Sequence, residues 1–258
     1  AGLLQSGDWR QTGRILVKDV GLLTEFAKFF RTENLETLKT IAKLALLDSW
    51  GTSLDDGFTK TVMDYNQEYM GIESGYSDEE MATLMMQNAM SDYIGKIYVE
   101  KHFDRQTKQD VTKMIQDIIA VYERRIDALT WMSADTKAKA KAKLNAITIK
   151  VGYPDDWSSY LDNAEITPVG EGGSYFITAN DITFPAAILQ APIYDVNASY
   201  EENLGSLGFI IAHEITHAFD GSGAKFDENG NAADWWTAED YRQFRSLCKD
   251  MIAFYDGQ

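Results

Sequence analysis

The chain has 258 residues, 45% of them hydrophobic, so it is long enough to bury a sizeable core in one large domain or two smaller ones. Acidic residues outnumber basic ones 40 to 24, and the formal charge of −16 argues against nucleic acid or anionic membrane surfaces as partners. The sequence has no run of about 18 uncharged apolar residues, so we expect no transmembrane segment in this chain. Its single cysteine, Cys248, excludes an internal disulfide and a thiolate metal cluster.

The first 150 residues are predicted to be mostly helical. Residues 22–50 carry apolar side chains at steps of three and four, with charges between them. Residues 77–103 begin with Ser77 and Glu80, which have the spacing of a helix capping box. The run KAKAKAK at 137–143 alternates as a strand would, but alanine and lysine favour helices, so we predict a solvated helix there.

The pattern changes near residue 147. Residues 147–157 (ITIKVGYPDDW) mix β-branched side chains with a Gly-Tyr-Pro break, which ends the helical part. Residues 175–184 (YFITANDITF) predict two short strands joined by a turn at 179–181. We therefore predict a mainly α fold with a small β component, divided into a helical domain at 1–150 and an α+β part at 151–258.

The segment GFIIAHEITHAFD at 208–220 is the strongest chemical signal in the sequence. Histidines four apart on a helix lie one turn from each other, with about 5–6 Å between Cβ atoms, so His213 and His217 can converge on one zinc ion. Glu214 lies on the same side of the helix, where a carboxylate suits a base that activates water. The opposite side is apolar and predicts a buried face, formed by Ile211, Ile215, Ala218 and Phe219.

An ordinary helix that happens to carry two core histidines is the alternative interpretation. Such a chance motif is expected in about one of a hundred chains of this composition, and two of the three histidines fall within it, so we favour the metal site. Zinc needs a third protein ligand, and no third histidine follows at a suitable spacing, so we expect a carboxylate from elsewhere. Asp220 is better placed to hold a histidine N–H than to bind the ion.

These residues resemble the neprilysin family of zinc metallopeptidases. The resemblance covers most of residues 85–258 and is carried by LTWMSADTKAKAKAKLNAITIKVGYPDDW at 129–157, ITFPAAILQAPIYD at 182–195, NLGSLGF at 203–209 and the stretch from IIAHEITH to WWTAED at 210–240. It implies a thermolysin-like catalytic domain that faces a helical domain across a chamber for peptides.

The resemblance also implies roles for individual residues. His213 and His217 would bind one zinc ion per full-length chain, Glu214 would be the general base and Asp220 a supporting carboxylate. The hairpin at 175–184 would offer an edge strand to an extended peptide substrate. Family members carry Asn-Ala-x-Tyr at the start of this strand, whereas this chain reads Gly172-Gly173-Ser174-Tyr175. The substrate-binding positions implied by the resemblance are Gly172, Gly173 and Tyr175. The tyrosine is retained but the asparagine and alanine are not, so we expect altered recognition of the peptide backbone or an altered substrate preference.

The third zinc ligand of the family is a glutamate in a Glu-x-x-x-Asp segment on a later helix, and nothing after Trp236 supplies it. The resemblance thus implies an internal piece of a longer protein, cut before the third ligand. We expect this chain alone to bind zinc weakly or not at all and to have little peptidase activity. The remainder of the catalytic domain is needed as its partner.

The sequence therefore predicts zinc-dependent hydrolysis of peptide bonds in short peptides, with water activated by zinc and a glutamate base. The alternative is a catalytically decayed relative that binds peptides or acts as a scaffold. The glycines at 172 and 173 favour this alternative, and the intact motif with Asp220 opposes it. We favour an exported or cell-surface bacterial protein, with the cytoplasm as the alternative compartment.

Overall fold

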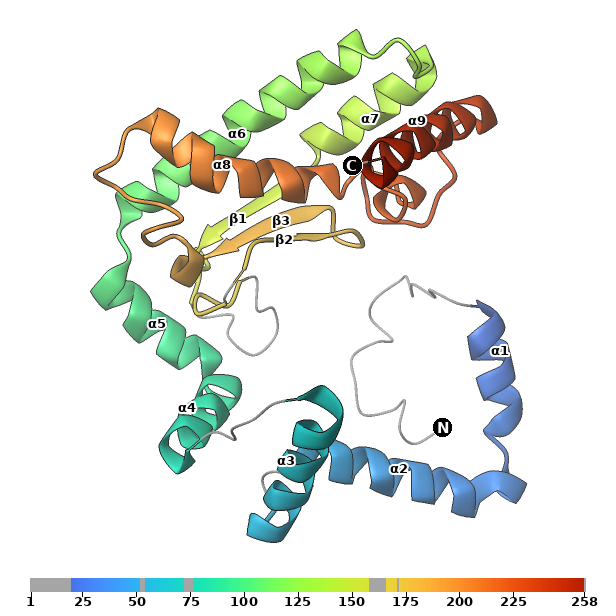
Figure 1. Ribbon diagram of the computed structural model, residues 1–258, viewed down its shortest axis with the longest axis vertical. Coiled ribbons are helices and arrows are strands. Elements are labelled where there is room, and N and C mark those ends of the chain that lie inside the picture. Colours follow the sequence, from blue (N-terminus) through green and yellow to red (C-terminus); the bar gives the residue numbers. More distant parts are fainter. Residues whose placement is uncertain (1–19, 52–53, 72–76, 158–165, 171, 258) are drawn as a thin grey trace. The chain divides into compact units, whose positions relative to one another are not determined.

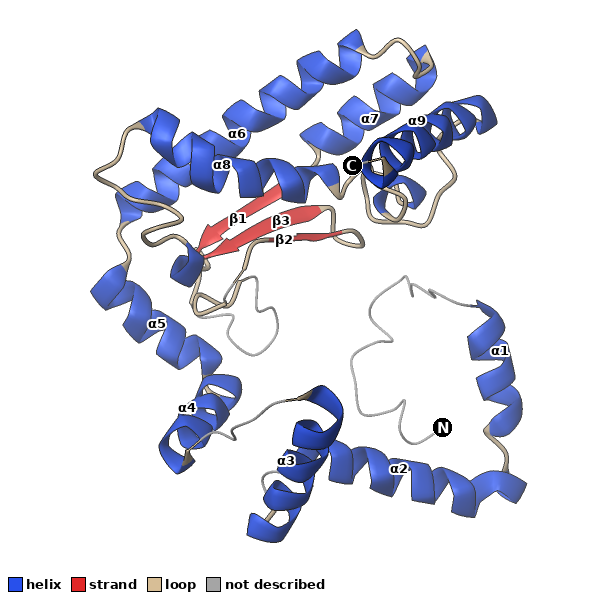
Figure 2. Ribbon diagram, in the orientation of Figure 1, coloured by secondary structure: helices blue, strands red, loops and turns tan. Residues whose placement is uncertain are grey.

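The computed structural model describes residues 20–51, 54–71, 77–157, 166–170 and 172–257 (Figure 1). Contacts divide the chain into two compact units, Ala1–Leu84 and Met85–Gln258. Figure 2 shows that helices predominate and that the strands form a single small sheet, which confirms the predicted fold class. Among the residues that the structure describes, no helix combines the length and the apolar character that a membrane span needs.

The first unit is helical wherever it is described. It contains α1 (Val20–Phe29), a short 3-10 helix (Thr32–Asn34), α2 (Leu35–Trp50) and α3 (Asp56–Met70), and α4 (Asp78–Ala89) begins in it. The predicted capping box is confirmed, since the Ser77 amide donates to Glu80 Oε2 at 2.8 Å and the Glu80 amide donates to Ser77 Oγ at 3.3 Å. Neither α2 nor α3 contains a described residue that is buried.

The second unit packs helices against a three-stranded sheet (Figure 2). Its helices are α5 (Ser91–His102), α6 (Arg105–Ala128), α7 (Ala134–Asn145), α8 (Tyr200–Thr216) and α9 (Ala238–Asp256). Strands β1 (Thr148–Gly152), β2 (Ser174–Phe176) and β3 (Asp181–Pro185) follow the order β1-β3-β2, with β1 parallel and β2 antiparallel to β3. A 3-10 turn (Ala186–Ile188) follows β3. The predicted hairpin is therefore confirmed, and its turn holds Asn180 at φ 49°.

The core of this unit lies where α6 packs against α7, α8 and β1. Successive turns of α6 bury Val111, Met114, Ile115 and Ile118, which follow the spacing expected of an amphipathic helix. The boundary between the compact units falls between residues 84 and 85 of the sequence. The change of pattern near residue 150 lies inside the second unit, because α6 packs against both α7 and β1. A domain boundary at residue 150 stays a prediction.

The run KAKAKAK forms the predicted helix, but the expectation of a fully solvated helix is wrong at Lys143. That residue is only 1% exposed, although Lys139 on the same helix is exposed. Residues 139 and 143 are one turn apart, so the difference arises from what covers the last turn of α7. The covering segment is the turn that follows α8, because its Gly223 and Phe226 carbonyl oxygens accept hydrogen bonds from Lys143 Nζ.

Candidate metal centre

The N-terminus of helix α8 is capped, and one face of the helix is buried. The Ser199 amide donates to Glu202 Oε2 at 2.8 Å, and the Glu202 amide donates to Ser199 Oγ at 3.2 Å, which completes a capping box. Further along, Leu207, Ile211 and Ile215 are fully buried. Of the apolar face predicted for this helix, Ile211, Ile215 and Ala218 are thus buried against the core and Phe219 is half-buried, whereas His213 of the motif is exposed.

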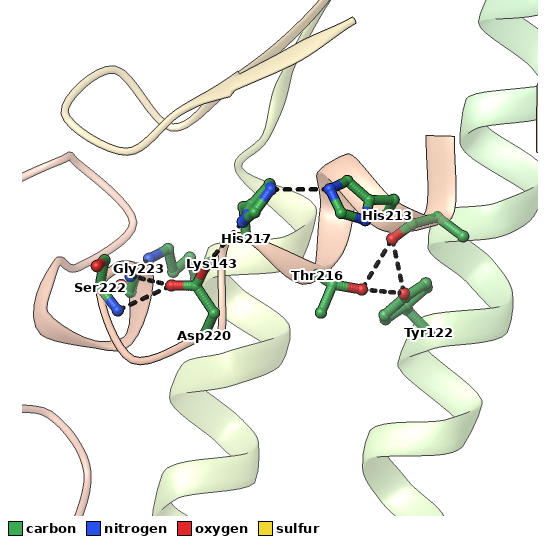
Figure 3. Close-up of polar contacts among 9 residues, drawn as sticks. Tyr122, Lys143, His213, Thr216, His217, Asp220, Ser222 and Gly223 are labelled. Carbon is green, nitrogen blue, oxygen red and sulfur yellow. Dashed lines mark hydrogen bonds and ion pairs between the residues drawn. The ribbon is translucent and has the colours of Figure 1, made fainter. Parts of the chain in front are cut away.

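The two histidines of the motif converge (Figure 3). Their Nε2 atoms lie 3.2 Å apart, and their rings are perpendicular, with centroids separated by 4.8 Å. Two nitrogens bound to one tetrahedral zinc ion at ~2.0–2.1 Å would lie about 3.3–3.4 Å from each other. The separation between His213 and His217 therefore fits a shared zinc ion with little movement of either side chain.

Asp220 contacts Nδ1 of His217, the ring nitrogen that is not directed at His213. Its Oδ2 lies 2.7 Å from His217 Nδ1, and its Oδ1 accepts the backbone N–H groups of Ser222 and Gly223, each at 2.8 Å (Figure 3). Burial opposes ionisation of this carboxyl, but the hydrogen bonds from His217, Gly223 and Ser222 outweigh it and lower the pKa of Asp220 below its ordinary value. An ionised Asp220 selects the tautomer with a proton on Nδ1, which leaves the Nε2 lone pair of His217 free for a metal.

Glu214 lies beside the two imidazoles. Its side chain is buried, and a carboxylate oxygen of Glu214 lies within 4.8 Å of ligand nitrogens of both histidines. These three residues form a group that could hold a metal ion, and no further Asp, Glu, Cys or His of the described chain belongs to it. The structure thus brings together His213, Glu214 and His217, with Asp220 directly behind them.

Tyr122 of α6 forms hydrogen bonds with the part of α8 that carries the motif. The Tyr122 hydroxyl donates to the Ala212 carbonyl at 2.9 Å and lies 2.7 Å from Thr216 Oγ1 (Figure 3). Tyr122 and Ala212 are 90 residues apart in the sequence, so no local pattern predicts this contact. It fixes the side of α8 that lies next to the motif.

The predicted substrate positions lie at and before β2. Among the described residues, β2 pairs with β3 on one side only and contacts α8. The side chain of Tyr175 is buried, and its hydroxyl donates to Asn180 Oδ1 at 2.6 Å. Gly172 is exposed, whereas Gly173 packs against Phe184 so closely that a Cβ would come within 2.5 Å of the ring. The side chain of Tyr175 is therefore engaged in the interior, whereas the next residue of the strand, Phe176, is exposed.

A large apolar cavity of about 780 Å³ lies on another side of α8. Its lining includes Ile118, Tyr122, Phe209 and Trp236 but neither histidine of the motif and not Glu214. This cavity is consequently separate from the candidate metal centre, although Asp220 and Thr216 contribute to its wall.

Comparison with known proteins identifies the family. Residues 2–154 and 173–258 match the two sequence profiles of peptidase family M13. A neutral endopeptidase of Lactobacillus helveticus is 32% identical over 95% of this chain, which corresponds to 43% of that protein. Mouse neprilysin is 32% identical over 64% of this chain and 28% of its own length. The chain thus spans less than half the length of these curated relatives.

Solved structures give the same result. PepO from Lactobacillus rhamnosis superposes with a TM-score of 0.77 at 30% identity, over 90% of this chain and 43% of that one. The zinc metalloprotease Zmp1 of Mycobacterium tuberculosis, solved with an inhibitor, superposes with a TM-score of 0.76 at 30% identity, over 90% and 40% of the two chains. The chain belongs to peptidase family M13, the family of neprilysin and the bacterial neutral endopeptidases.

Proposed function

We propose that this chain is part of a longer zinc metallopeptidase, here called the full-length protein, which hydrolyses peptide bonds in short peptides. The observation that carries this proposal is the 3.2 Å separation of the Nε2 atoms of His213 and His217, with Glu214 beside them. The printed names of the relatives, neutral endopeptidase and zinc metalloprotease, support the same activity.

The residues of this chain have distinct tasks in the proposed reaction. Zinc, when bound, supplies a Lewis acid that polarises the peptide carbonyl and lowers the pKa of water. His213 and His217 hold the ion through Nε2, and Asp220 keeps the His217 ring in the required tautomer. Glu214 takes a proton from the attacking water and passes it to the leaving amine.

The third ligand is proposed to be a carboxylate from outside this chain, with one ion bound per full-length protein. Three protein ligands are usual for catalytic zinc, and within the described residues only His213, Glu214 and His217 gather at this place. If Glu214 serves as the base, the two histidines alone leave the site one ligand short. Zinc binding is then expected to be weak in this chain and tight in the full-length protein.

The substrate is proposed to lie extended along β2. An edge strand next to α8 can add a peptide through main-chain hydrogen bonds, which suits substrates of varied sequence. Gly172 offers no side chain to the peptide, at the position where the resemblance to the neprilysin family implies an asparagine, so recognition is expected to depend on backbone contacts alone at this point.

The experiment is a digest of a short-peptide library by the full-length protein, with and without a zinc chelator. We expect cleavage that is lost with the chelator and restored by added zinc, because removing the ion removes the group that polarises the carbonyl. Cleavage that is insensitive to the chelator would contradict the proposal. Tight binding of peptides without any cleavage would instead support the decayed relative, which the glycine at 172 favours.

A further inference from the structure

We propose that Lys143 is a positioning residue for the metal centre: its buried ammonium group fixes the turn at 220–226, which holds Asp220 against His217, and its backbone carbonyl links this turn to the hairpin of β2 and β3. The inference rests on the proposed function, because it concerns the same metal centre. It assigns a role to a side chain that lies on neither the motif helix nor the strand.

The first step is the contact between Lys143 and the turn. Lys143 Nζ donates to the carbonyl oxygens of Gly223 and Phe226, at 2.6 and 2.7 Å. The amide of Gly223 in turn donates to Asp220 Oδ1 at 2.8 Å, and Asp220 Oδ2 contacts His217 Nδ1 at 2.7 Å. Figure 3 shows Lys143 beside Gly223 and Asp220. The ammonium group is thus connected to the imidazole through three hydrogen bonds, by way of Gly223 and the Asp220 carboxylate.

The turn lies directly against the end of α8, so its position is sensitive to small shifts. A Cβ on Gly223 would come within 1.8 Å of the His217 carbonyl oxygen, which only glycine can avoid. The Ala224 amide also donates to the Asp220 carbonyl at 2.9 Å. The carbonyls of Gly223 and Phe226 also accept from the Phe226 amide and from Trp235 Nε1, each at 3.0 Å. Without the donor from α7, each carbonyl would lose its one charged partner, and we expect the closely packed turn to relax away from His217.

The side chain of Lys143 also carries a buried positive charge. Burying an ammonium group costs free energy of folding unless the group is paired or hydrogen-bonded. If Lys143 only filled space, methionine, which is apolar and of similar length, could replace it without loss of stability. Burial lowers the pKa of Lys143 to about 8, against the opposing effect of Asp227, Asp220 and Glu228, so the group is still charged at neutral pH. A charged donor makes stronger bonds to carbonyl oxygens than a neutral one. This favours a role in holding the turn over simple packing.

The last step is the link to β2. The Lys143 carbonyl accepts from Asn180 Nδ2 at 3.1 Å, and Asn180 Nδ2 also donates to the Glu228 carbonyl at 3.0 Å. Asn180 Oδ1 accepts from the Tyr175 hydroxyl of β2 at 2.6 Å. The residue Lys143 therefore contacts the metal-site turn through its side chain and the hairpin through its backbone. A substitution at 143 should disturb the metal centre more than β2, since only the side-chain contacts are removed.

The test compares Lys143→Met with Lys139→Met in the full-length protein. Both change a lysine of α7 to the same residue, but Lys139 is exposed. We expect Lys143→Met to weaken zinc binding about 10–100-fold, the usual effect of losing support behind a metal ligand, and to speed hydrogen exchange at the amides of Ser222 and Gly223. Lys139→Met is expected to change neither quantity.

Zinc affinity is measured by competition with a chelator, on folded protein only. A Lys143→Met variant that melts earlier but binds zinc as the wild type does would overturn the positioning role and leave a structural one. If this variant does not fold, hydrogen exchange in the metal-free wild-type protein tests the inference instead. Its Ser222 and Gly223 amides are expected to be protected from exchange like those of α8, and free exchange at both would overturn the inference. A wild type that binds no zinc would refute the proposed function, while the exchange data still report on the turn.

Discussion

Glu214→Gln in the full-length protein is expected to reduce kcat for peptide cleavage about 10³-fold while zinc remains bound. Glutamine has the shape of glutamate but accepts no proton from water, and general bases contribute about 10²–10⁴-fold to such reactions. The side chain is buried beside the histidines, so an isosteric change leaves their convergence intact. Turnover is followed with a peptide substrate, and bound zinc is measured by elemental analysis.

The matched control is Glu201→Gln, because Glu201 is exposed in the first turn of the same helix. This control is expected to cleave peptides at the wild-type rate. If Glu214→Gln keeps wild-type turnover, another group is the base and the role proposed for Glu214 is wrong. If zinc is lost along with activity, Glu214 acts as a ligand instead.

Asp240→Ala is expected to lower the free energy of unfolding by about 2–4 kcal/mol, since a buried carboxylate with several hydrogen bonds is lost. Asp240 is 1% exposed and joins the starts of two helices. It accepts hydrogen bonds from the Ser133 amide at 2.8 Å and the Thr136 hydroxyl at 2.6 Å, both at the start of α7. It also accepts from the Thr237 hydroxyl at 2.6 Å, which caps α9.

The same residue predicts a dependence of stability on pH. Burial opposes ionisation of Asp240, but hydrogen bonds from Thr136, Thr237 and Ser133 outweigh it and hold its pKa well below the ordinary value of 3.8. Because the folded pKa is the lower one, this carboxylate stabilises the protein fully above the ordinary value, and that contribution declines as the pH falls below it. Asp240→Ala should therefore lose less stability than the wild type does on acidification from about pH 4 to pH 2.

Both effects are measurable by urea unfolding of the full-length protein, followed by tryptophan fluorescence, since the buried Trp236 lies near the start of α9. The control is Asp250→Ala, at an exposed position of α9, for which we expect a change within about 0.5 kcal/mol. Equal losses in the two variants would show that the link between α7 and α9 contributes little.

Much of the candidate site could be predicted because its geometry is local. The spacing of His213 and His217 on one helix determines that their rings meet, and the apolar positions of α8 determine which side is buried. Asp220 follows by a single turn, so its contact with His217 also depends on near neighbours in the sequence. The hairpin of β2 and β3 was predictable for the same reason, from its turn residues.

The contacts that support this site join distant segments and have no local pattern. In the run KAKAKAK, Lys139 and Lys143 both follow an alanine in an alternating pattern, and this local repeat does not reveal that Lys143 is buried and Lys139 exposed. Its partners lie 80 and 83 residues further along the chain. The parallel pairing of β1 with β3 is likewise set by tertiary packing, and it places α6 and α7 in the same unit as the sheet.

The central claim is that His213 and His217 bind one zinc ion through their Nε2 atoms. A crystal structure of the zinc-loaded full-length protein, with anomalous data collected at the zinc absorption edge, tests it most directly. We expect one anomalous peak within ~2.0–2.1 Å of both Nε2 atoms, with a carboxylate from outside this chain as the third protein ligand. A zinc peak elsewhere, or both imidazoles turned away from an ion that is present in the crystal, would contradict the account.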